Sequence, residues 1–138
     1  MGLTVLDAGV LIGFLDADDA HHVAARKELE ASRDRHDRVA LPASALAEAL
    51  VGPSRRGDDA IRRVDAFLER LPIEVVPLDR PIAVAAAALR ARHGGRLKLP
   101  DALVVATANV LAADVLVTTD RDWPGPDALG LVPTLVVL

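Results

Sequence analysis

The chain has 138 residues and a formal net charge of −4, and 51% of its residues are hydrophobic although only 2% are aromatic. This length suits one domain, residues 1–138, with a core of small aliphatic side chains. The absence of cysteine excludes disulfides, thiolate chemistry and zinc–thiolate sites. No charge-free stretch is long enough to span a bilayer and no secretory signal is evident, so the sequence predicts a cytoplasmic protein without membrane contact.

Short β-branched and apolar runs alternate with segments of helical spacing along the chain. We predict strands at residues 3–6, 39–41, 73–77, 115–118 and 134–138. We predict helices at residues 8–15, 21–33, 42–51, 61–71, 81–93 and 100–113, the third of them ended by Gly52-Pro53. Such alternation is typical of an α/β protein in which helices cover both faces of a parallel sheet.

Four acidic residues stand alone inside otherwise apolar stretches: Asp7, Glu48, Asp101 and Asp120. Two of them directly follow predicted strands, and the carboxyl ends of parallel strands meet at one edge of a sheet. Glu48 lies on a helix that is apolar on every side, which predicts a largely buried helix. If the fold gathers these carboxylates, they form an oxygen-lined site suited to a hard divalent cation such as Mg²⁺.

Each acid taken singly also has an ordinary structural interpretation, as a turn residue or a helix N-cap. The other acids, including those at 16–19, 34–37 and 58–59, stand among polar residues and are predicted to lie on solvated faces or in turns. The histidines lie in polar segments, which disfavours a histidine base. A receiver-like binding domain would carry paired acids after the first strand, where this chain has Asp7 alone.

The basic residues leave two interpretations open. The pairs Arg55-Arg56 and Arg62-Arg63, and the group Arg90, Arg92, Arg96 and Lys98, either contact phosphates or form solvated helix faces. The negative net charge disfavours nucleic-acid binding, but bound divalent cations would offset it.

Four segments in order carry a resemblance to a known family: VLDAGVLIGFLD at 5–16, LPASALAEAL at 41–50, LPDALVVATA at 99–108 and LVTTDRDW at 116–123. They resemble the PIN-domain family and, within it, the VapC-type toxins of bacterial toxin–antitoxin pairs. The resemblance implies a three-layer α/β/α sandwich around a mainly parallel sheet. It also implies an endoribonuclease that depends on Mg²⁺ or Mn²⁺ and cleaves tRNA or rRNA, a homodimer, and inhibition by a VapB-like antitoxin.

The resemblance further implies that the four isolated acids are the catalytic and metal-binding residues: Asp7, Glu48, Asp101 and Asp120. Thr118 matches the family's hydroxyl residue two positions before the last acid, and Asp122 is an extra acid with either a supporting or a turn role. One position departs from the pattern, because Gly9 stands where relatives often have Ser or Asn. The alternative within the family is a catalytically inactive PIN-like scaffold that only binds partners.

Overall fold

The computed structural model describes all residues 1–138 and contains one five-stranded sheet. Its strands are β1 (Leu3–Leu6), β2 (Arg38–Pro42), β3 (Ile73–Val76), β4 (Val115–Thr118) and β5 (Thr134–Val137). Their order in the sheet is β3-β2-β1-β4-β5, and every neighbouring pair is parallel. The predicted strands are confirmed to within one residue at each end, and the predicted parallel sheet is confirmed.

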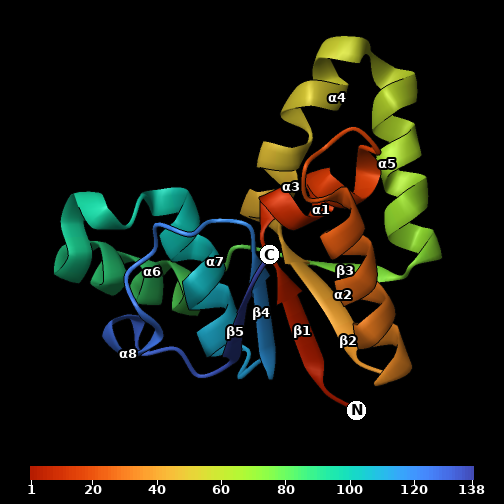
Figure 1. The fold of residues 1–138 in the computed structure, drawn as a ribbon. Helices are drawn as coiled ribbons and strands as arrows, with labels where there is room; N and C mark the ends of the chain where they lie inside the picture. Colours follow the sequence, from red (N-terminus) through yellow and green to blue (C-terminus); the bar gives the residue numbers. More distant parts are fainter.

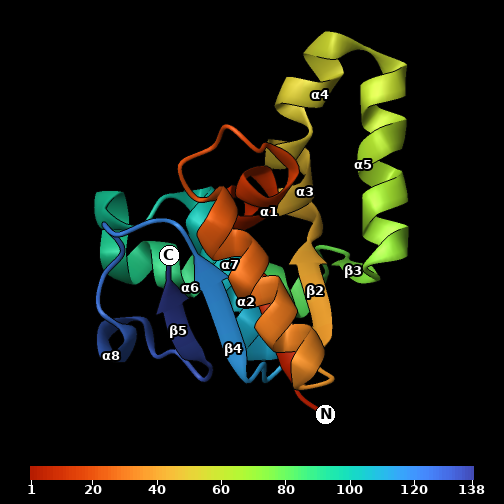
Figure 2. The ribbon, with the colours of Figure 1, turned by 45° about the vertical axis from the view of Figure 1, so that its right-hand side comes forward.

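Helices cover both faces of this sheet. They are α1 (Ala8–Leu15), α2 (His22–Asp34), α3 (Ala43–Ala49), α4 (Val51–Arg56), α5 (Asp58–Arg70), α6 (Arg80–His93), α7 (Leu99–Val110) and α8 (Pro126–Leu129), with a 3-10 turn η1 (Gly94–Arg96). In Figures 1 and 2, α1 and α2 lie over one face, and α6 and α7 lie over the other. The three-layer α/β/α sandwich is therefore confirmed. None of the helices combines the length and the apolar character that a membrane span requires.

The segment that follows β2 differs from the prediction. Pro42 is the last residue of β2, and the helix after it breaks at Leu50 rather than at Gly52-Pro53. A new helix, α4, starts at Val51, so Pro53 falls in its first turn, where a missing N–H costs no helical hydrogen bond. The chain then turns at Gly57, whose φ of 111° favours glycine. Helices α4 and α5 form a hairpin that projects beyond the carboxyl end of the sheet (Figure 1).

Small aliphatic side chains let α7 pack directly against the sheet. Residues 104–106 and 108 of this helix are buried, as are Val5 and Leu6 of β1 and Leu116 and Val117 of β4. Burying one Val or Leu side chain contributes about 1.5–3 kcal/mol to folding. This core holds the first turn of α7, which contains Asp101, at a defined place beside β1 and β4.

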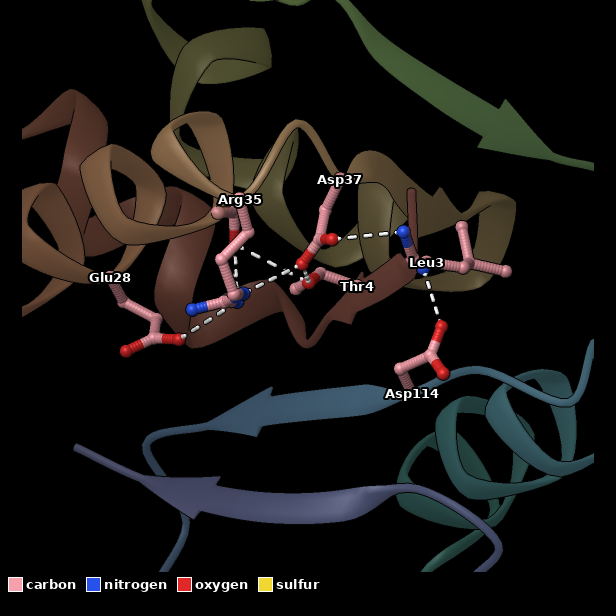
Figure 3. A network of polar contacts seen from close by, with 8 residues as sticks. Leu3, Thr4, Glu28, Arg35, Asp37 and Asp114 are labelled. Atoms are coloured by element: carbon pink, nitrogen blue, oxygen red, sulfur yellow. Dashed lines mark hydrogen bonds and ion pairs between the residues drawn. The ribbon is translucent and has the colours of Figure 1, made fainter.

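A polar network fixes the start of β1, at the amino end of the parallel strands (Figure 3). Asp37 accepts hydrogen bonds from the Gly2 N–H (3.0 Å), Thr4 Oγ1 (3.2 Å) and Arg35 Nε (2.9 Å). Burial would raise the pKa of Asp37, but these hydrogen bonds and the charge of Arg35 hold it below its usual value. Asp37 was predicted to lie on a solvated face or in a turn; its side chain in fact anchors the start of β1, the strand that Asp7 follows.

Candidate active site

The carboxyl end of β1 is the point where the direction of strand addition reverses. From β1 the chain adds β2 and β3 on one side, and later adds β4 and β5 on the other. In open α/β sheets, the crevice at such a reversal is the usual place for a ligand. The ladder between β1 and β4 continues past Leu6, because the Asp7 N–H donates to the Val117 carbonyl oxygen (2.9 Å). Asp7 therefore lies at the head of this crevice, directly beside Thr118.

Asp7 is only 7% exposed, and both of its side-chain oxygens accept hydrogen bonds. Oδ1 accepts from the Ala8 N–H (2.7 Å) and so caps α1, and Oδ2 accepts from Thr118 Oγ1 (2.7 Å). Burial raises the pKa of Asp7, the two hydrogen bonds oppose that rise, and the charge of Asp120 adds to it. Asp7 is thus an N-cap, as its ordinary interpretation suggested, and also a buried carboxylate in the crevice.

Thr118 links the first acid to the last one. Its buried hydroxyl donates to Asp7 and accepts from the Asp120 N–H (3.0 Å). The Asp120 Oδ1 in turn accepts from the Asp122 N–H (2.8 Å), which closes a tight turn after β4. Asp122 is exposed and contacts Asp120 through its backbone. Thr118 thereby holds two acid-bearing segments at a set separation, whereas Asp122 belongs to the turn.

Asp101 is partly buried in the first turn of α7. Burial, and after it the charges of Asp7, Asp120 and Glu48, raise its pKa to about 6. The positive end of the α7 dipole favours the ionised form, but burial and the surrounding negative charge outweigh it. Asp101 is consequently the acid on which the charges of all three others act.

Glu48 lies near the end of α3, and here one expectation is wrong. The helix was predicted to be largely buried, but only Ala45 and Ala49 of α3 are buried and Glu48 itself is exposed. Its apolar residues are mostly alanines, whose small side chains do not need burial on every side. Partial desolvation of the Glu48 carboxyl group and the charge of Asp7 still raise its pKa.

The four acids therefore come from four separate segments and act on one another electrostatically. As the side chains stand, no three Asp, Glu or His residues lie close enough together to hold one metal ion. Two carboxylates at 4 Å repel by about 4 kcal/mol at an effective dielectric near 20, so without a cation they are expected to stand apart. The possible ligands are carboxylate oxygens, without any thiolate, and such ligands fit Mg²⁺ or Mn²⁺. To be bound by several of these carboxylates, the cation would have to bring their side chains closer together.

A groove of about 630 Å³ opens from Glu48 between α1, α4 and α5. Its lining combines the apolar side chains of Ile12 and Phe67 with the basic side chains of Arg56 and Arg63, and it also contains the acids Asp16 and Asp18. These two arginines belong to the pairs for which phosphate contact was one interpretation. Arg90, from the other basic group, instead donates to the Leu97 carbonyl oxygen (2.7 Å) and stabilises the end of α6.

Sequence reasoning assigned no role to Trp123, the only tryptophan of the chain. Its Nε1 atom is buried and makes no hydrogen bond within 3.5 Å, yet the indole N–H still acts on Asp101 and opposes the rise of its pKa. The sequence already indicates that Trp123 lies near the acids, because this single tryptophan follows Asp120 by three residues. The proximity to Asp101 makes Trp123 a natural fluorescent reporter of this site.

Fold and site together define an α/β/α protein with an acidic crevice at the carboxyl edge of an all-parallel sheet. The family model for the PIN domain matches residues 4–128, and the chain belongs to the PIN domain family. No curated protein matches the sequence.

Solved structures share the fold over nearly the whole chain. VapBC2 from Rickettsia felis, bound to a DNA fragment from its promoter, has a TM-score of 0.76 at 18% identity and covers 98% of both chains. A toxin–antitoxin complex from Klebsiella pneumoniae has a TM-score of 0.74 at 24% identity, covering 97% of this chain and 96% of that one. Mycobacterium tuberculosis VapC20, a sarcin–ricin loop cleaving toxin, has a TM-score of 0.70 at 23% identity, covering 86% and 91%.

Proposed function

We propose that this protein is a divalent-metal-dependent endoribonuclease and the toxin of a VapBC-type toxin–antitoxin pair. The observation that carries the proposal is that four acids from distant segments lie toward one edge of the sheet, where burial and neighbouring carboxylates raise the pKa values of Asp7, Glu48 and Asp101. The likeness in fold to VapC20, a toxin that cleaves the sarcin–ricin loop, supports RNA as the substrate, with rRNA or tRNA as the class.

The metal ligands in this proposal are Asp7, Glu48, Asp101 and Asp120. A bound Mg²⁺ or Mn²⁺ would supply the positive charge that activates water and stabilises the leaving oxygen of a phosphodiester. Thr118 keeps the Asp7 carboxylate in one orientation, and each carboxylate oxygen has a second lone pair for a further partner. Arg56 and Arg63 would hold RNA phosphates in the groove beside Glu48.

The test is cleavage of labelled tRNA and rRNA fragments by the purified chain with Mg²⁺, with Mn²⁺, and with EDTA. We expect cleavage at restricted positions that requires metal and is absent in EDTA. Cleavage that persists in EDTA would contradict the metal-dependent mechanism. No cleavage of any RNA under all three conditions would instead favour an inactive PIN-like scaffold. The receiver-like alternative is already disfavoured by the family match and by the single acid after β1.

We further propose a VapB-like antitoxin as the protein partner and a homodimer as the assembly. The exposed apolar side chains of Ile12, which lines the groove beside Glu48, and of Val51 offer a contact surface for such a partner. Several solved structures of the same fold are toxin–antitoxin complexes. Light scattering of the purified protein tests the dimer, and co-purification with the product of a neighbouring antitoxin-like gene tests the partner.

The mode of inhibition follows from the charge of the crevice. We expect an antitoxin Arg or Lys to contact at least two of the four acids and to exclude the metal, because a guanidinium pairs bidentately with carboxylates. Replacing that basic residue by Ala should restore RNA cleavage in the complex while leaving much of the binding, which apolar contacts supply. A complex that stays inhibited after this replacement would show that inhibition works by another route.

A further inference from the structure

Gly9 and Thr119 meet where two acid-bearing segments touch. Gly9 lies in the first turn of α1, two residues after Asp7, and Thr119 lies between Thr118 and Asp120. A Cβ atom added to Gly9 would overlap Thr119 Oγ1 and come within 3.3 Å of Thr119 Cβ. Gly9 has no positive φ, so its backbone conformation would accept any residue. The side chain of Thr119 as it is placed, and not the backbone, therefore disfavours any residue larger than glycine at this position.

The Thr119 side chain is partly exposed, and no hydrogen bond within the chain uses its hydroxyl. The hydroxyl of Thr118, one residue earlier, is buried and already bonded to Asp7 and to the Asp120 N–H. A threonine hydroxyl offers one donor and two acceptor positions, and those of Thr119 remain available beside the crevice. The space that a side chain at position 9 would fill is thus occupied by a free hydroxyl from the end of β4.

We propose that Thr119 is a positioning residue of the acidic site and that its hydroxyl takes the place of a polar side chain at position 9. It would hydrogen-bond a water molecule or a phosphate oxygen held between Asp7 and Asp120. Because this inference refines the site of the proposed function, it rests on that function for its activity readout. Its steric part, that residues 9 and 119 share one space, can be measured on the metal-free protein.

Two variants of residue 119 separate the effect of its hydroxyl from the effect of the space that the side chain fills. Thr119→Val keeps the shape and removes the hydroxyl, so its melting temperature should stay within about 2 °C of the parent. Its Mn²⁺ affinity or RNA cleavage should fall by about 10- to 100-fold, as for other residues that orient a metal site. Thr119→Ser keeps the hydroxyl and should rescue this loss. Mn²⁺ binding is followed by the fluorescence of Trp123, the only tryptophan.

A second set of variants moves the hydroxyl from residue 119 to residue 9. It consists of Gly9→Ser, Thr119→Ala and the combination of both. The single Gly9→Ser change should lower the melting temperature by roughly 3–10 °C, because the added atoms overpack against Thr119. The double variant should recover most of the melting temperature and also the Mn²⁺ affinity, since its new hydroxyl enters the vacated space. Thr119→Ala alone should fold normally and bind Mn²⁺ as weakly as Thr119→Val.

Two outcomes would overturn the inference. Full Mn²⁺ affinity and cleavage in Thr119→Val would show that the hydroxyl has no positioning role. A double variant no more stable than Gly9→Ser would show that the two residues do not share one space. If the parent binds Mn²⁺ but cleaves no RNA, the proposed function fails, while melting temperatures and Mn²⁺ titrations still decide the inference. Unaltered Mn²⁺ binding in all the variants of residue 119 would overturn it in that case too.

Discussion

Replacing Asp101 with Asn should lower metal-dependent RNA cleavage by about a thousandfold, the effect of losing several kcal/mol of transition-state stabilisation. Asp101 is the acid on which the charges of Asp7, Glu48 and Asp120 all act, which makes it a sensitive test of the proposed metal ligands. An amide has nearly the shape of the carboxylate but no negative charge for a cation. Single-turnover cleavage at saturating Mn²⁺, with circular dichroism to verify folding, measures the effect.

Asp65→Asn is the matched control, because Asp65 is an exposed acid of α5 outside the acidic crevice. This control should cleave RNA as the parent does. Asp7→Asn should lose as much activity as Asp101→Asn, but it also removes one of the two acceptor oxygens that serve Ala8 and Thr118. Cleavage by Asp101→Asn at the parental rate would remove this residue from the site.

Asp101→Asn should also stabilise the metal-free protein at neutral pH. The expected gain in the free energy of unfolding is about 1–2 kcal/mol, after a reduction for solvent screening of the partly exposed Asp101 carboxylate. Asp101 has a pKa of about 6 in the folded protein, against about 3.9 in an unfolded chain. Above pH 6 the folded state therefore carries an ionised carboxylate that burial and three neighbouring acids disfavour. Asn carries no such charge, and we expect a melting temperature roughly 3–6 °C higher in EDTA.

The direction of the pH dependence follows from the same values. Between about pH 4 and pH 6 the folded protein binds more protons than the unfolded chain, so the free energy of unfolding of the metal-free parent should fall as the pH rises. Below that window Asp101 is protonated in both states and the penalty is absent. The raised pKa values of Asp7 and Glu48 act in the same direction. Asp101→Asn should show a shallower decline in urea unfolding measured across this range.

Bound Mn²⁺ or Mg²⁺ should offset the electrostatic penalty of the ionised Asp101 carboxylate. A ligand at 100 times its dissociation constant stabilises the folded state by about 2.7 kcal/mol, so Mn²⁺ or Mg²⁺ should raise the melting temperature of the parent clearly. The rise should be smaller in Asp101→Asn, which lacks one carboxylate ligand. If every single substitution in the quartet instead destabilised the metal-free protein, these acids would be structural caps and hydrogen-bond hubs, as Asp7 is in part.

Much of this protein follows from local features of its sequence. Apolar runs such as Leu3–Leu6 and Val115–Thr118 are strands because both faces of such runs can be buried in a sheet covered by helices. The middle of α7 is buried because it carries no charged side chain. The isolated acids were likewise identifiable, because burying a lone carboxylate in an apolar stretch costs free energy unless a partner compensates its charge. Local patterns of this kind depend on residues only a few positions apart.

Only the tertiary structure decided how these pieces meet. The hydrogen bond between Thr118 and Asp7 joins residues 111 positions apart, and no local pattern specifies that β1 and β4 are neighbours. The break between α3 and α4 at Leu50 was misplaced at Gly52-Pro53, because a proline is equally acceptable in the first turn of a following helix. Position 9 lacks a polar side chain, and only the folded chain places the Thr119 hydroxyl in the space that such a side chain would fill. Local chemistry selects the elements, whereas shape and charge between distant segments determine what those elements build together.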